Sequence, residues 1–246
     1  MPWSGWLRGA LYAVLLLMTA LWLAGLLLAR VDFFYPTAYR ALDIGATLAT
    51  YAPNNRYGKR DFAVCDAREH ARLFAEIAHA IRHDGDGLNE LRYRDPSGRE
   101  LGVLLTADEV THLRDVARLV AVGEALGLAA ALGWLVMLAL LRWRGLSPPG
   151  ARAMLAGGLA LAVLLAALLA AVGPLELFYA WHAWVFPPGH PWFFYYEDSL
   201  MSSLMKAPDL FAFIGAVWLF TGLFLLLALA SLGHAIGRPP NSRRSI

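Results

Sequence analysis

Two histidines near carboxylates are the residues of this chain best suited to chemistry. The first, His112, has Glu109 three residues before it and Asp115 three residues after it. On a helix this spacing puts all three side chains on or near one face. A carboxylate beside an imidazole fixes its tautomer and stabilises the imidazolium, as general acid–base catalysis requires. A solvated helix face with ordinary ion pairs has the same spacing, and that alternative stays open.

The second histidine, His182, lies in an unusually aromatic stretch at 177–211. The stretch reads LFYAWHAWVFPPGHPWFFYYEDSLMSSLMKAPDLF, and its prolines break any helix shortly after the histidine. Trp and Tyr also gather at membrane surfaces as anchors, with the histidine merely bonded to backbone. Anchoring alone does not account for a histidine followed, beyond a proline turn, by the adjacent carboxylates Glu197 and Asp198. Ionisable groups at a membrane are candidates for function.

Other chemistries find little support in the sequence. The helical spacing of His79 and His83 suits a metal, but no third convincing ligand accompanies them, so neither a metal nor a cofactor is expected. The single cysteine, Cys65, cannot form an intramolecular disulfide and is expected to be a small buried residue. His190 has no evident partner. Sequence patterns for a serine nucleophile or a phosphate loop are missing.

Four long apolar runs must position these residues. The chain has 246 residues, 59% of them hydrophobic, and a mean hydropathy of +0.50. Each run reaches the roughly 20 residues needed to cross a bilayer. The net charge of +2 is spread out, so nucleic-acid binding is not expected. These features predict an α-helical integral membrane protein with four transmembrane helices and a small α+β extracytoplasmic cap between helices 1 and 2.

The predicted segments divide the chain into helices, loops and a cap. They are transmembrane helix 1 at 1–30, the cap at 31–105, a projecting helix continuing into transmembrane helix 2 at 106–141, a cytoplasmic loop at 142–153, transmembrane helix 3 at 154–174, the extracytoplasmic aromatic and histidine motif at 175–208, transmembrane helix 4 at 209–233 and a cytoplasmic tail at 234–246. The first apolar run is longer than that of a signal peptide, so we expect it to be retained.

Positive charge in short loops predicts the orientation of these helices. The connection between helices 2 and 3 holds Arg142, Arg144 and Arg152, whereas the aromatic connection between helices 3 and 4 holds only Lys206. Short arginine-rich loops stay in the cytoplasm. Both histidines are therefore expected on the outer side of the membrane.

Local signals also predict structure within the cap. A helix is expected at 66–83, followed by a β-hairpin that turns at 95–98. Thr106 and Glu109 form a capping-box pattern that opens the next helix. No helix breaker follows until that helix has run about 50 Å, so its first turns, which contain His112, are expected to project from the bilayer.

Two segments resemble one known family. The segment 106–116, TADEVTHLRDV, is similar to the first histidine segment of the lipoprotein intramolecular transacylases. The segment 182–211, HAWVFPPGHPWFFYYEDSLMSSLMKAPDLF, is similar to their second histidine motif. The family has four transmembrane helices with a cap between the first two, as derived above. This chain departs from the family in having Ala107–Asp108–Glu109 before the first histidine and in the sequence of the cap.

The resemblance implies a membrane acyltransferase of the bacterial cytoplasmic membrane, with its active site on the outer face. Such an enzyme moves an acyl chain from the diacylglyceryl group of a lipoprotein to the amino group of that lipoprotein's N-terminal cysteine. His112 and His182 would be catalytic, with Glu109 and Asp115 supporting them. The residues expected to bind the substrate are Trp181, Phe186, Trp192, Phe194, Tyr195 and Asp198.

Two other functions fit the same residues. One is a lipid-active acyltransferase or hydrolase that uses both histidines on a different substrate. The other is a non-catalytic membrane scaffold whose cap binds a partner. In every case the chain is expected to contact the lipid bilayer. The two enzymatic functions also require a lipoprotein or another lipid as substrate.

Overall fold

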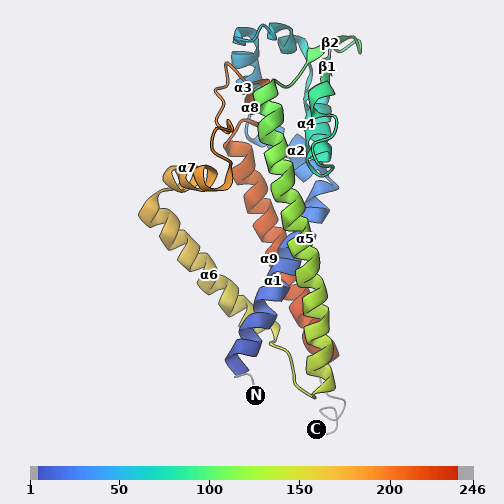
Figure 1. Cartoon of the computed structure of the whole chain (residues 1–246), viewed down its shortest axis with the longest axis vertical. Helices are drawn as coiled ribbons and strands as arrows, with labels where there is room; N and C mark the ends of the chain where they lie inside the picture. The colour runs from blue at the N-terminus through green and yellow to red at the C-terminus, as the bar shows by residue number, and fades with distance from the viewer. Residues whose placement is uncertain (1–4, 238–246) are drawn as a thin grey trace. The chain divides into compact units, whose positions relative to one another are not determined.

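The computed structural model describes residues 5–237 and is predominantly helical (Figure 1). Four of its helices are long and apolar enough to cross a membrane, judged by length and composition. They are α1 (Gly5–Ala29), α5 (Ala107–Trp143), α6 (Ala151–Val172) and α9 (Asp209–Gly237). The prediction of four such helices is confirmed within the part of the chain that the structure describes.

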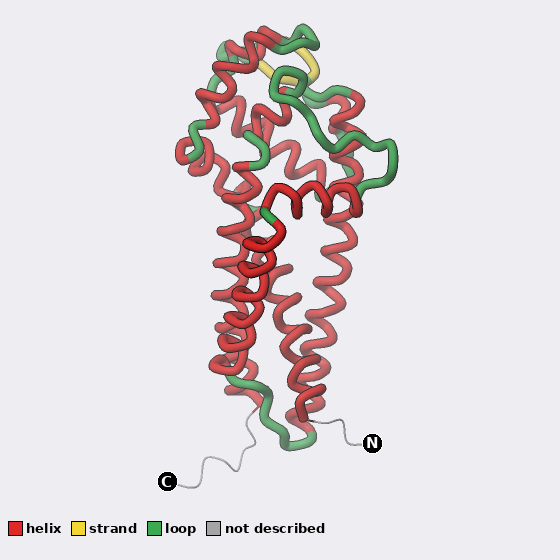
Figure 2. Tube along the Cα trace, turned by 90° about the vertical axis from the view of Figure 1, so that its left-hand side faces the viewer, coloured by secondary structure: helices red, strands yellow, loops and turns green. Residues whose placement is uncertain are grey.

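Shorter elements fill the connections between these four helices. The α-helices are α2 (Tyr35–Ala41), α3 (Ile44–Tyr51), α4 (Ala67–Ile81), α7 (Pro174–Val185) and α8 (Leu200–Met205). Short 3-10 helices are η1 (Asp32–Phe34), η2 (Ala52–Asn54), η3 (Arg60–Val64) and η4 (Leu88–Glu90). The strands are β1 (Arg92–Arg94) and β2 (Glu100–Val103), which form a single antiparallel pair, seen in yellow in Figure 2.

The chain divides into two compact units. The first unit contains the described residues up to Leu27, the segment Gly123–Leu177 and the described residues from Val217 onward. The second unit contains Leu28–Val122 and Phe178–Ala216. The helices α1, α5, α7 and α9 contribute residues to both units, and both candidate catalytic histidines belong to the second.

Close helix packing holds the first unit together. Tyr12 and Leu16 of α1 pack with Trp134 of α5 and Leu226 of α9 in one buried cluster. A Cβ atom on Gly233 would lie 2.6 Å from the Tyr12 hydroxyl oxygen, so any larger residue here would force the buried Tyr12 side chain to shift. Small residues permit such close approach between membrane helices, where the hydrophobic effect drives little association.

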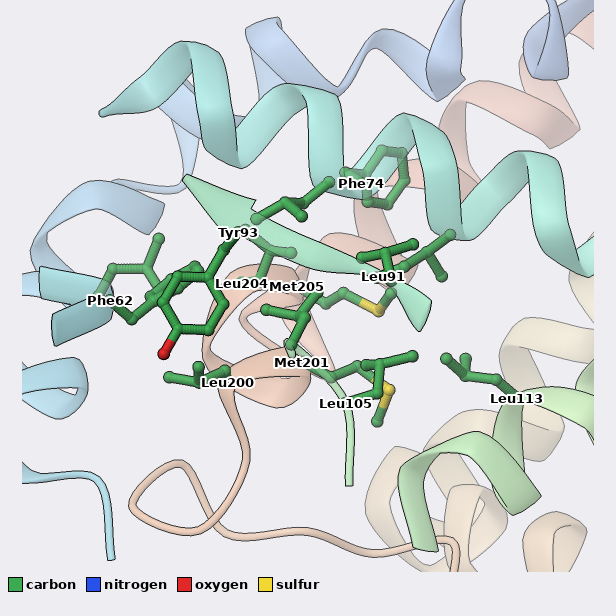
Figure 3. Packing of buried hydrophobic residues seen from close by; sticks show 14 of the residues in the cluster. Phe62, Phe74, Leu91, Tyr93, Leu105, Leu113, Leu200, Met201, Leu204 and Met205 are labelled. Carbon is green, nitrogen blue, oxygen red and sulfur yellow. The ribbon is translucent and has the colours of Figure 1, made fainter. Parts of the chain in front are cut away.

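The second unit has a separate hydrophobic core. Phe74 of α4, Tyr93 of β1, Leu113 of α5 and Leu204 of α8 are all buried in it. Figure 3 shows these elements converging, with the methionines of α8 among the aromatic and aliphatic side chains. The amphipathic spacing of α4 turns its apolar face to this core. Elements far apart in the sequence are thereby fixed beside the first turns of α5.

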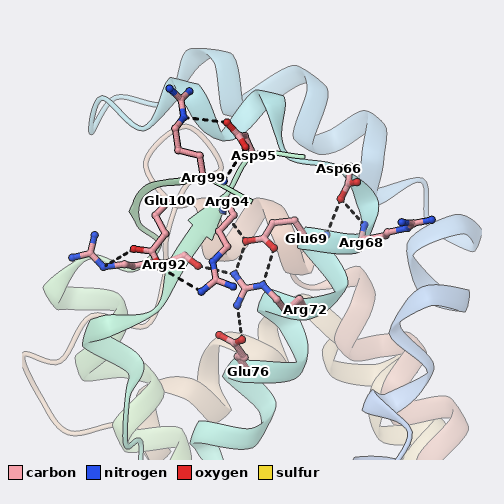
Figure 4. Close-up of polar contacts among 10 residues, drawn as sticks. All are labelled: Asp66, Arg68, Glu69, Arg72, Glu76, Arg92, Arg94, Asp95, Arg99 and Glu100. Atoms are coloured by element: carbon pink, nitrogen blue, oxygen red, sulfur yellow. Dashed lines mark hydrogen bonds and ion pairs between the residues drawn. The ribbon is translucent and has the colours of Figure 1, made fainter. Parts of the chain in front are cut away.

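Polar contacts fix the predicted hairpin to α4 (Figure 4). Asp66 caps α4 by accepting hydrogen bonds from the Arg68 and Glu69 amides at 3.0 and 2.9 Å. Glu69 Oε1 also accepts from the Arg94 amide of β1 at 2.8 Å, and Arg72 donates to the Arg92 carbonyl at 2.7 Å. The hairpin prediction is confirmed, and the helix expected at 66–83 is found as α4.

The predicted capping box opens α5. The Glu109 amide donates to Thr106 Oγ1 at 3.3 Å, and the Thr106 amide donates to Glu109 Oε2 at 2.5 Å. These reciprocal bonds satisfy two amides that the helix itself leaves without partners. From this start α5 runs without interruption to Trp143, as expected. His112 therefore lies in its second turn.

Candidate functional site

His112 faces aromatic side chains from the stretch that follows α7. Its ring centroid lies 4.8 Å from that of Phe186 and 5.8 Å from that of Phe194. Its Nδ1 atom is buried and has no hydrogen-bond partner among the described residues. Buried polar atoms are nearly always satisfied in proteins, so this nitrogen is one of the few buried polar atoms of the described residues that is left to form a new hydrogen bond.

His182 occupies the last turns of α7 and is only 8% exposed. Its Nδ1–H donates to the Phe178 carbonyl at 2.8 Å, which leaves Nε2 as the acceptor of the neutral ring. The rings of Phe178 and Trp192 lie 3.9 and 4.9 Å from the imidazole. Burial lowers the pKa of His182 below its ordinary value and outweighs the bond to Phe178, which acts in the opposite direction. The neutral imidazole, which can accept a proton, is therefore favoured.

Phe186 is the side chain that the two histidines share. Its ring lies 4.8 Å from His112 and is stacked on His182 at 5.5 Å, and it is 6% exposed. It follows directly after α7, where Pro187 and Pro188 prevent the helix from continuing. The two histidines, 70 positions apart in the sequence, thus lie on one aromatic cluster of the second unit.

Glu109 does not have the role expected for it beside His112. Its Oε2 closes the capping box, and its Oε1 accepts a hydrogen bond from Ser199 Oγ at 2.5 Å. Glu109 and Ser199 are each 1% exposed. The Ser199 hydroxyl in turn accepts from the Ser202 amide and caps α8. One carboxylate oxygen is bonded at the start of α5 and the other at the start of α8. Glu109 therefore joins these two helix ends.

Asp115 forms its hydrogen bond with another histidine, while its charge still opposes the lowering of the His112 pKa that burial causes. It is 5% exposed, and its Oδ2 accepts from His190 Nδ1 at 2.5 Å. Its Oδ1 accepts from Arg118 Nη1 at 2.9 Å. The sequence offered no sign of this pair, because His190 lies 75 positions away in a turn that Gly189 closes with a φ of +85°. The structure thus places a third histidine against the carboxylate that lies three residues after His112 on α5.

The remaining predicted binding residues lie at different distances from the histidines. Trp181 packs edge-on against His182 at 4.7 Å, so it belongs to the same cluster. Tyr195 is 61% exposed and packs against Phe193. Asp198 forms an ion pair with Arg56 at 3.4 Å. Asp198 therefore links the aromatic stretch to the turn before η3.

Other titratable groups are accounted for by packing. Cys65 is buried, and burial raises the pKa of its thiol to about 12, so it stays protonated and unreactive. His79 and His83 stack on each other at 4.0 Å. Within residues 5–237, no group of three or more potential ligands is arranged to hold a metal ion. Two hollows of about 300 and 150 Å³ lie in the second unit, and neither is lined by His112, His182 or His190.

Comparison with known proteins adds no further information, since no family profile, curated protein or solved structure matches this chain. The resemblance to the transacylases stays a prediction based on the two histidine segments.

Proposed function

We propose that this protein is a membrane acyltransferase that moves an acyl chain within a lipoprotein. The chain would leave the diacylglyceryl group and bind to the amino group of the lipoprotein's own N-terminal cysteine. The observation that carries the proposal is the packing of His112 and His182 on the common ring of Phe186. An apolar wall next to two proton-transfer groups suits a substrate that joins acyl chains to a reactive polar group.

The chemistry requires proton transfer at two atoms. The amine nitrogen attacks the ester carbonyl carbon, the carbon–oxygen bond breaks, and the glyceryl oxygen leaves as an alcohol. An imidazole can take a proton from the nitrogen, and an imidazolium can give one to the departing oxygen. Since His182 Nε2 is the acceptor of its neutral ring, His182 is well placed to act as a base. The histidines thus replace a nucleophilic side chain, and no acyl-enzyme forms.

Keeping water away from the ester distinguishes transfer from hydrolysis. The rings of Phe178, Trp181, Phe186 and Trp192 surround His182, and Phe194 adds to the wall at His112. Apolar walls favour attack by an amine that is already bound over attack by water. Because donor and acceptor belong to one molecule, holding them in contact supplies a high effective concentration.

The site is proposed to face outward from the bacterial cytoplasmic membrane. The short loop between α5 and α6 contains three arginines, which are retained on the cytoplasmic side. The segments before α5 and after α7 would then lie outside, where the lipid-bearing end of a lipoprotein also lies.

Mass spectrometry of lipoprotein N-terminal peptides tests the proposal. The protein would be expressed in a host that makes diacylglyceryl lipoproteins but cannot N-acylate them. Intramolecular transfer leaves the total mass unchanged while fragment ions place one acyl chain on the N-terminal residue. Peptides that keep both chains on the glyceryl group would contradict the proposal. Peptides that lose one chain entirely would identify a hydrolase instead.

A further inference from the structure

The hydrogen bond between Asp115 and His190 joins a buried carboxylate to a histidine that reaches solvent. The aspartate is 5% exposed, whereas the histidine side chain is 37% exposed. A carboxylate only accepts hydrogen bonds, so His190 Nδ1 carries the proton and Nε2 of the neutral ring holds the lone pair. A buried carboxylate behind an imidazole both fixes that tautomer and stabilises the imidazolium formed by proton uptake.

Charged and titratable groups of α5 surround this pair. Asp115 contributes the negative charge, and Arg118 of α5, 73% exposed, holds the other carboxylate oxygen. His112 lies one turn earlier on α5. His182, by contrast, bonds only a neutral carbonyl through Nδ1 and is nearly buried, so it has less to stabilise a positive charge and less contact with water.

The proton balance of the proposed reaction calls for two separate destinations. At neutral pH an N-terminal amine is mostly an ammonium ion, and the amide product keeps one hydrogen on nitrogen. Two protons must therefore leave the nitrogen. One goes to the departing glyceryl oxygen, and the other is released to water. The buried histidines suit the transfer to oxygen, but the release to water needs a base that reaches solvent.

We propose that His190, held by Asp115, accepts the first proton of the substrate ammonium through Nε2 and passes it to solvent. The inference rests on the proposed acyl transfer and assigns it a third histidine. The nitrogen gains its lone pair, His190 becomes an imidazolium, and loss of that proton to water restores the neutral ring. His112 and His182 then move the second proton from nitrogen to oxygen.

Alkaline rescue tests this assignment. Purified full-length protein in nanodiscs would be given a synthetic diacylglyceryl peptide with a free amino terminus, and N-acylation would be followed at pH 6.5 and pH 9. His190→Gln should be about 10-fold or more slower than wild type at pH 6.5, because it can use only peptide that arrives as free amine. At pH 9, where most N-terminal amines are free, it should come within about two-fold.

Three comparisons make the result decisive. Asp115→Asn, which removes the charge behind the imidazole, should show the same rescue. His182→Gln should be slow at both pH values, and His83→Gln, which changes an exposed histidine just after α4, should match wild type at both. If His190→Gln lowers the N-acylation rate equally at the two pH values, or does not lower it at pH 6.5, the inference is overturned while the proposed function stands. A wild-type protein that forms no amide would refute both.

Discussion

Ser199 and Glu109, 90 positions apart in the chain, share a buried hydrogen bond of 2.5 Å in which the hydroxyl donates to the carboxylate. Each residue also caps a helix of its own, α8 and α5 respectively. The bond therefore joins two helix N-termini through one pair of side chains. It fixes the turn of α5 that precedes His112 relative to the segment that follows the aromatic stretch.

Removing this bond should lower stability substantially. Glu109→Ala deletes a cap and leaves the Ser199 hydroxyl without its acceptor, so the free energy of unfolding should fall by about 2–4 kcal/mol. Ser199→Ala should lower it by about 1–2 kcal/mol, and the double variant should lose less than the sum. Unfolding of the detergent-solubilised protein gives these values. Asp108→Ala, an exposed change in the same turn, should stay within about 0.5 kcal/mol, and an equal loss there would refute the account.

His70 should make the protein less stable in acid. It is 5% exposed, its Nδ1 bonds the Tyr39 hydroxyl at 3.0 Å, and burial lowers its pKa from 6.5 to about 4. The unfolded chain takes up this proton near pH 6.5 but the folded protein only near pH 4. The contribution of His70 to the free energy of unfolding is thus fully present above pH 6.5. It falls by about 3 kcal/mol in all as the pH drops toward 4.

The comparison variant for this prediction is His70→Gln, which can bond Tyr39 but does not titrate. Between pH 7 and pH 4.5, the thermal unfolding temperature should fall less steeply for this variant than for wild type. His79→Gln, at an exposed position on the same helix, should keep the wild-type slope. Parallel slopes for His70→Gln and wild type would show that His70 does not contribute.

Trp192 and Trp184 form a matched pair for testing the aromatic wall. Trp192 lies 4.9 Å from His182, whereas Trp184, in the same aromatic stretch, is 84% exposed. Trp192→Ala should slow N-acylation by about 10-fold or more, because the ester would lose its apolar wall, while Trp184→Ala should stay within about two-fold. Thermal unfolding of both variants serves as the control. If each variant loses activity only in proportion to its loss of stability, the two tryptophans act as membrane anchors and not as a wall of the site.

Membrane orientation can be measured by labelling intact cells with an impermeant maleimide. In a Cys65→Ser background, cysteine at Ser97 or Trp184 should be labelled and cysteine at Ser147 should not. All three positions are exposed, so burial does not decide the result. Labelling should appear at Ser147 only after the cells are broken. The reverse pattern would put His112 and His182 on the cytoplasmic side.

The sequence predicted those features that depend on nearby residues or on composition. The capping box of Thr106 and Glu109 and the hairpin at 95–98 are local signals, and the four apolar helices follow from composition. The partners of Glu109 and Asp115 could not be predicted in this way. Ser199 and His190 reach them only through tertiary folding, across 90 and 75 positions, and helical spacing suggested His112 instead.

Acyl transfer by purified protein is the most direct test of the central claim, that the histidines on Phe186 perform acid–base catalysis. The substrate is a synthetic diacylglyceryl peptide, with an N-acetylated copy as the blocked control. Wild type should convert only the free-amine peptide to its N-acyl isomer, without releasing fatty acid. His112→Gln and His182→Gln should each be slower by about 100-fold or more while unfolding at wild-type temperatures, since glutamine cannot shuttle a proton. Wild-type rates in either folded variant, or fatty acid as the main product, would contradict the claim.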